Sequence, residues 1–193
     1  MTDTTVKTGG RTLVCATWKS KTFAGLLAVA GALALPQLVH WLGAVSGMGS
    51  ALGETFLPMH LAVILAGLFA GPLVGLAAGA ISPAVSFLLS GMPAAAVLPF
   101  MTVELAGYGL AAGLLASVRM PAFFKLLIAQ VAGRALRSAA VLIAFYGFGG
   151  GLPVASIWTS IVTGLPGIVL QWALVPLIVF WVERMAARKG EHD

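Results

Sequence analysis

The chain has 193 residues, of which 60% are hydrophobic and only 9% are charged, and its formal net charge is +5. Soluble domains carry about 25% charged residues, so 11 basic and 6 acidic side chains are too few to cover a water-soluble protein of this length. This composition excludes soluble enzymes and nucleic-acid-binding modules and indicates a protein of the lipid bilayer. The long apolar runs do not alternate as the strands of a membrane β-barrel do, so the predicted fold class is an all-α membrane protein.

Residues 1–21 are polar and are predicted to form a tail. The apolar run 22–45 that follows is longer than the hydrophobic region of a cleaved signal peptide, which has about 7–15 residues. We therefore expect an uncleaved first membrane span.

The stretch 57–90 contains no Asp, Glu, Lys or Arg. As one helix it would be about 50 Å long, whereas the hydrocarbon core of a bilayer is about 30 Å thick. Because the turn signal Gly71-Pro72 lies inside it, the stretch is predicted to form two spans, 57–70 and 72–90. The remaining predicted spans are 94–117, 121–147 and 157–182.

The basic residues indicate which ends of these six spans face the cytoplasm. Lys and Arg are enriched in cytoplasmic loops. With six spans, the N-terminal tail, the loop 118–125 and the C-terminal tail 185–193 lie on one side and contain basic residues, whereas the opposite loops contain none. We therefore expect a single transmembrane domain over residues 22–184 with both tails in the cytoplasm.

Three charged residues lie away from the ends of the predicted spans, namely Glu104, Arg134 and Arg137. A charge at the bilayer centre costs about 2.5–3.5 kcal/mol on insertion scales, so each needs a partner. In one interpretation Glu104 pairs with Arg134 and holds two helices together. In the other, one arginine remains over and binds a carboxylate or phosphate of a ligand, because a guanidinium group matches such anions.

Other residues in the sequence indicate a function less specifically. His60 at a span entrance is more often an interfacial residue than a ligand-binding one, and Trp158 fits either an aromatic belt or a stacking contact with a flat ligand. Gly164-Leu165-Pro166 and Pro176 predict a broken or kinked last span whose freed backbone groups could bind a ligand. The sequence has no metal-binding motif and no ATP-binding loop, so no metal, no cofactor and no ATP hydrolysis by this chain are expected.

Small residues recur every four positions in two series, which favours close helix packing. The series are Ala24, Ala28 and Ala32 in the first span and Gly67, Gly71, Gly75 and Gly79 around the predicted turn. Both fit packing inside the bundle, and the alanine series also fits a contact face for a partner subunit.

Short motifs in a fixed order resemble the substrate-binding S components of energy-coupling factor (ECF) vitamin transporters. They are Phe56-Leu57-Pro58-Met59-His60, Ala66-Gly67-Leu68-Phe69-Ala70-Gly71-Pro72, Ser82-Pro83, Gly91-Met92-Pro93, Glu104-Leu105-Ala106-Gly107-Tyr108-Gly109, Gly133-Arg134, Leu165-Pro166-Gly167-Ile168, Gln171 and Val182-Glu183-Arg184. The resemblance covers residues 22–184. The chain departs from it at Ala94, where relatives often have a second proline, and in its longer N-terminal tail.

The resemblance implies a six-helix S component that captures a vitamin from outside the cell. It implies a transmembrane T component as partner, docked on Ala24, Ala28 and Ala32, and two ATP-binding-cassette ATPases that drive transport. With the charge argument, it makes the following residues the candidate substrate site: Glu54, His60, Met92, Glu104, Arg134, Arg137, Trp158 and Gln171.

We therefore expect a subunit that binds a small water-soluble vitamin or precursor. The surplus arginine favours a carboxylate such as pantothenate, while cobalamin, riboflavin, folate and a queuosine precursor remain open. Two alternatives come from other classes of protein. One is a membrane enzyme acting on lipid with Glu104 and His60 as acid and base, and the other is a structural membrane subunit.

Overall fold

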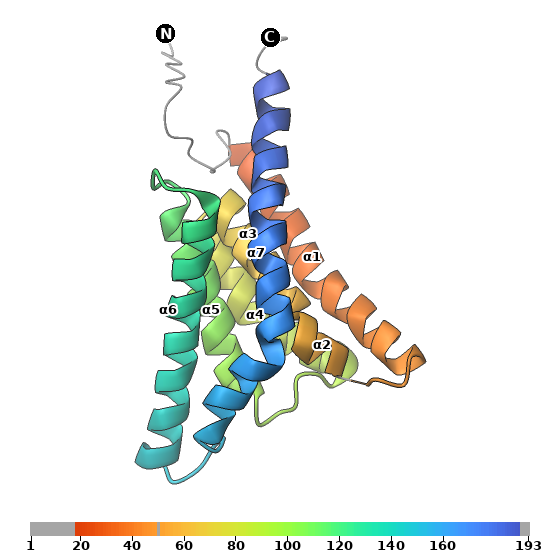
Figure 1. Cartoon of the computed structure of the whole chain (residues 1–193), viewed down its shortest axis with the longest axis vertical. Coiled ribbons are helices and arrows are strands. Elements are labelled where there is room, and N and C mark those ends of the chain that lie inside the picture. Colours follow the sequence, from red (N-terminus) through yellow and green to blue (C-terminus); the bar gives the residue numbers. More distant parts are fainter. Residues whose placement is uncertain (1–17, 50, 190–193) are drawn as a thin grey trace.

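The structure, a computed structural model, describes residues 18–49 and 51–189, and the regular secondary structure in this part of the chain is entirely helical (Figure 1). The helices are joined by short connections. In chain order they are α1 (Trp18–Val45), α2 (Ala51–Phe56), α3 (Pro58–Ala70), α4 (Pro72–Ser90), α5 (Leu98–Leu115), α6 (Ala122–Leu142), the π-helical turn η1 (Ile143–Gly147) and α7 (Ala155–Lys189).

The helices confirm the predicted division of the chain into membrane spans. Within the described residues, five segments are long and apolar enough to cross a membrane, and α1 precedes them. The break between α3 and α4 falls at Gly71, which has φ +97°. Glycine adopts this conformation readily, and Pro72 suits the first turn of the next helix because its missing N–H needs no partner there.

Several predicted boundaries differ from the structure. Helix α1 begins at Trp18 rather than at residue 22, and α7 runs on to Lys189 rather than ending at residue 182. The predicted span 94–117 begins as a helix only at Leu98, because residues 91–97 form the connection that contains Pro93. The last span, which is predicted to be broken or kinked at Gly164-Leu165-Pro166, is one continuous helix that bends, so it is kinked and not broken. The helix accommodates Pro166 and Pro176 by bending rather than by ending, and Figure 1 shows the bend in the lower part of α7.

Helix α3 lies at the centre of the bundle and packs against α1, α4, α5 and α7. Its Val63, Ile64 and Leu68 are fully buried and form the core with Leu105 of α5 and Leu126 of α6. Elsewhere the helices expose many large apolar side chains, as expected of a surface that faces lipid.

Helices α4 and α5 make the closest contact in the bundle, and glycine allows it. A Cβ atom on Gly109 would collide with the carbonyl oxygen of Gly75, and one on Gly79 would collide with the carbonyl oxygen of Leu105. Gly67 of α3 approaches the same part of α5. Gly67, Gly75 and Gly79 therefore serve packing inside the bundle, whereas a Cβ on Gly71 would meet nothing within 4 Å. Ala24, Ala28 and Ala32 belong to α1, but their side chains lie outside the described residues.

The start of α1, the end of α7 and the connection between α5 and α6 lie at one end of the molecule (Figure 1). The connections after α1, α4 and η1 lie at the opposite end. The chain therefore has one end with basic residues such as Arg119 and Arg184 and one end whose connections contain no Lys or Arg.

Candidate functional site

A cavity of about 400 Å³ lies at the end of the bundle that holds the connections after α1, α4 and η1. Ligand pockets commonly measure about 300–1,000 Å³, so the cavity can hold a small molecule. All seven α-helices and the connection after α4 contribute to its wall. The wall is mostly apolar, with a few polar groups that gather at its two sides.

A buried ion cluster forms one side of the cavity. Arg134 and Arg137 lie one turn apart on α6 and therefore share a face. Arg134 Nη1 lies 3.0 Å from Glu104 Oε1, and Arg137 Nη1 donates to Glu104 Oε2 at 2.7 Å. Tyr108 also donates its hydroxyl to Glu104 Oε1 at 2.8 Å, so several donors surround the carboxylate.

This geometry alters the predicted pairing. Glu104 binds both arginines rather than Arg134 alone, so Arg137 also has a protein partner. The charge balance is nevertheless as predicted, since two guanidinium groups share one carboxylate. Glu104 itself is fully buried and does not line the cavity, whereas both arginines do. The cavity is thus bordered by positive charge.

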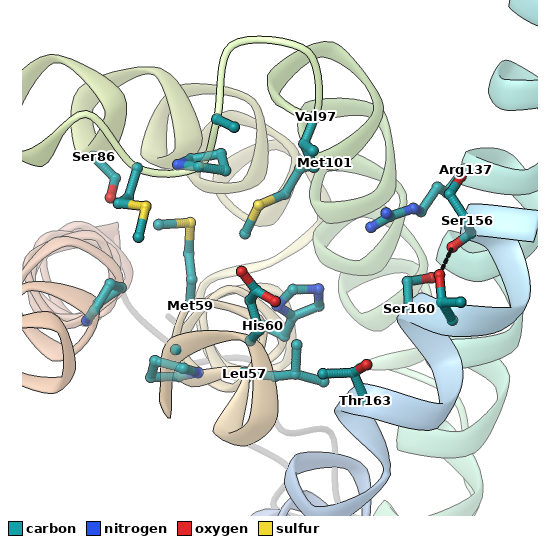
Figure 2. A pocket seen from close by; sticks show the side chains of 18 of the residues that line it. Leu57, Met59, His60, Ser86, Val97, Met101, Arg137, Ser156, Ser160 and Thr163 are labelled. Carbon is teal, nitrogen blue, oxygen red and sulfur yellow. Dashed lines mark hydrogen bonds between the residues drawn. The ribbon is translucent and has the colours of Figure 1, made fainter. Parts of the chain in front are cut away.

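Several polar atoms of this cluster are buried without a hydrogen-bond partner, namely Arg134 Nε and Nη2, Arg137 Nε and both ring nitrogens of His60. His60 lies 3.7 Å from Glu104 and only 4% of its surface is exposed. Figure 2 shows the guanidinium group of Arg137 directed toward His60 across the cavity. Buried polar groups normally have partners, so unpaired N–H donors beside a cavity indicate a place for an acceptor, and their charge favours an anion.

Helix α7 adds hydroxyl groups to the same side. Ser156, Ser160 and Thr163 line the cavity, and Arg134 Nη1 donates to Ser160 Oγ at 3.3 Å. Their spacing along the chain places them on one helical face. This stripe of small polar residues in an otherwise apolar span is a sequence signal that the prediction of the site missed.

Three methionines, Met59, Met92 and Met101, line the cavity. Figure 2 shows the side chains of Met59 and Met101 between Ser86 on one side and Arg137 on the other. Methionine is flexible and polarizable, so this part of the wall suits an apolar portion of a ligand.

The side of the cavity near α1 and α4 carries uncharged polar groups and one carboxylate. Gln37 donates to Ser86 Oγ at 3.3 Å, and the Nδ1 atom of His40 is buried without a partner. The exposed Glu54 of α2 also lines the cavity. The two sides therefore differ in chemistry.

The junction between α2 and α3 lies at Leu57, which lines the cavity and adopts a left-handed conformation with φ 49° and ψ 47°. Gln171 of α7 donates to the Leu57 carbonyl oxygen at 3.4 Å and accepts a hydrogen bond from Gln130 of α6 at 3.0 Å. Trp172 in turn donates to Gln130 at 2.8 Å. This buried network ties the junction to two other helices.

The structure brings most of the predicted site residues to the cavity. Those that line it are Glu54, His60, Met92, Arg134 and Arg137. Glu104 lies behind the arginines, and Gln171 lies behind Leu57. Trp158 is 68% exposed, on the face of α7 opposite Ser156 and Ser160. Binding of a substrate by these residues remains a prediction.

Two comparisons with known proteins found nothing, and a third found a family. The family model described as "ECF transporter, substrate-specific component" matches residues 22–179 and so includes every residue that lines the cavity. Neither the comparison with curated proteins nor that with solved structures gave a match.

Proposed function

Because the chain belongs to the family of ECF transporter substrate-specific components, we propose that its cavity captures a small water-soluble vitamin or vitamin precursor that carries a carboxylate. Membership makes the chain a multi-pass protein of the cell membrane and the substrate-binding subunit of a transporter. Its partners in such a transporter are a T component and ATPases.

Family membership also decides between the alternatives. A substrate-specific component binds its solute and leaves it chemically unchanged, so the chain is not an enzyme acting on lipid. It is not a purely structural subunit either. Glu104 and His60, which such an enzyme would use as acid and base, belong instead to the ion cluster beside the cavity.

The observation that carries the carboxylate proposal is the charge of the cluster at the cavity wall: Arg134 and Arg137 line the cavity and share the single carboxylate of Glu104. The net positive charge of the cluster favours binding of a ligand carboxylate. The methionines support an apolar centre for the same ligand. Pantothenate, which combines one carboxylate with a branched apolar centre and hydroxyl groups, fits this arrangement.

The cavity is proposed to open toward the outside of the cell. Basic loops favour the cytoplasmic side, and Arg119 and Arg184 lie at the end of the bundle away from the cavity. A solute could then reach the site from the external medium.

Native mass spectrometry of the detergent-purified protein tests this proposal, with extraction of any bound molecule and a thermal-stability screen against a vitamin panel that includes pantothenate. A co-purifying or stabilising vitamin with a carboxylate is the expected result. A protein that purifies empty and gains no stability from any member of the panel would contradict it, and a bound vitamin without a carboxylate would contradict the anion site alone.

A further inference from the structure

The ion cluster beside the cavity has an uneven charge balance that bears on the ligand. It contains two guanidinium groups and one carboxylate, so its net charge is +1 when His60 is counted as neutral at pH 7. The two positive residues face the cavity, and the negative one is shielded from it completely.

Glu104 occupies positions that a ligand could otherwise take. Each of its two oxygens contacts a different arginine, at 3.0 and 2.7 Å, and Tyr108 fixes one of these oxygens through its hydroxyl. Both arginines line the cavity, whereas Glu104 does not. The protein therefore supplies one internal anion for two guanidinium groups and leaves one positive charge uncompensated beside the cavity.

We propose that Glu104 is a specificity-determining residue that limits the ligand to one negative charge at this side of the cavity. This inference rests on the proposed function, since it assumes that the cavity binds a solute. A monocarboxylate then brings the cluster to neutrality. A dicarboxylate or a phosphate dianion would leave a net negative charge in a site surrounded by apolar side chains, which is unfavourable.

Removal of the Glu104 charge should change the preference between monoanions and dianions by tenfold or more, because Glu104 and the ligand anion would share the same two guanidinium groups.

The test uses three probes with the same linear six-carbon chain, namely hexanamide, hexanoate and butylmalonate, which is hexanoate with a second carboxylate on C2. They carry no, one and two negative charges at one end. Ligand-induced stabilisation of the purified full-length protein gives their apparent affinities. We expect the wild type to prefer hexanoate. We expect Glu104→Gln, which keeps the shape of the side chain and raises the cluster to +2, to prefer butylmalonate.

Further variants separate charge from structure. Arg134→Gln brings the cluster to zero and should abolish the preference for hexanoate over hexanamide. The double variant Glu104→Gln/Arg134→Gln returns it to +1 and should restore the order of the wild type. Tyr108→Phe is the matched control, because it removes a hydrogen bond from the same carboxylate without changing any charge, and it should keep the preference for hexanoate.

The results with these variants distinguish a failure of the Glu104 proposal from a failure of the proposed function. We call the limit of one negative charge per ligand the charge rule. If Glu104→Gln binds the probes in the same order of affinity as the wild type, or if Arg134→Gln still favours hexanoate, the charge rule is overturned while the proposed function stands. If Glu104→Gln does not fold, the probe preferences of Arg134→Gln and of the double variant test the charge rule. If the wild type binds a vitamin but none of the three probes, the charge rule is also overturned. If it binds neither vitamins nor probes, the proposed function fails first.

Discussion

A guanidinium group inside a membrane protein is costly unless acceptors surround it, and Glu104 accepts a hydrogen bond from Arg137. The proposed function adds a ligand carboxylate as a second partner. Arg137→Ala should weaken binding of the ligand tenfold or more, because loss of one partner of a buried charge pair costs about 2–5 kcal/mol. Titration of the purified variant with the vitamin identified in the screen measures the effect. Arg119→Ala removes the same charge far from the cavity and should leave the affinity unchanged. Equal affinities for both variants would contradict an anion site at Arg137.

At the level of elements, the contact between α4 and α5 depends on glycine. Gly109→Ala should lower the free energy of unfolding by about 1–3 kcal/mol, because the added methyl group meets the backbone of Gly75 and forces the helices apart. Gly31→Ala in α1 is the control, since a Cβ there meets nothing within 4 Å. Thermal unfolding in detergent compares the two, and equal midpoints would show that the helices separate at no cost.

The junction between α2 and α3 depends on a different interaction. A leucine in the left-handed region is disfavoured by about 1–2 kcal/mol, and such strain persists where surrounding contacts hold it. Gln171→Leu removes a donor from the Leu57 carbonyl and leaves Gln130 without one of its partners. We expect a loss of stability of about 1–3 kcal/mol, the cost of an unsatisfied buried polar group, together with weaker ligand binding at the cavity that Leu57 lines.

Trp172→Phe is the control for this network. It removes only the outermost hydrogen bond, from a side chain that is 38% exposed. Its effect on the unfolding midpoint should be smaller than that of Gln171→Leu, and its effect on ligand affinity should be close to zero. If the two variants lower the affinity equally, the contact with Leu57 does not shape the cavity.

At the scale of the whole molecule, the orientation in the membrane decides whether the cavity meets external solutes. Cys15 is the only cysteine, so a Cys15→Ser background allows single cysteines to be placed at either end. We expect Gly150→Cys to react with a membrane-impermeant maleimide in intact cells and Arg119→Cys to react only after the cells are opened. The reverse pattern would place the cavity on the cytoplasmic side and contradict capture from outside.

Local features of the sequence were sufficient to predict the order of the membrane-spanning helices along the chain. Hydropathy and length located the spans, and Gly71-Pro72 marked the break between α3 and α4, because a turn depends on the conformational preferences of a few neighbouring residues. At Pro166 the same local reasoning left a broken and a kinked helix open, and only the structure shows that α7 continues through the proline and bends.

The sequence by itself therefore determined the all-helical membrane fold, the surplus of one positive charge within the spans and the resemblance to the ECF family. Only the tertiary structure decided that Glu104 contacts both arginines, that Gln171 reaches Leu57 rather than the cavity, and that Met59 and Met101 form its wall. The physical reason is that these contacts join residues as far as 114 positions apart. They depend on how each helix is rotated and packed against its neighbours, which no local pattern encodes.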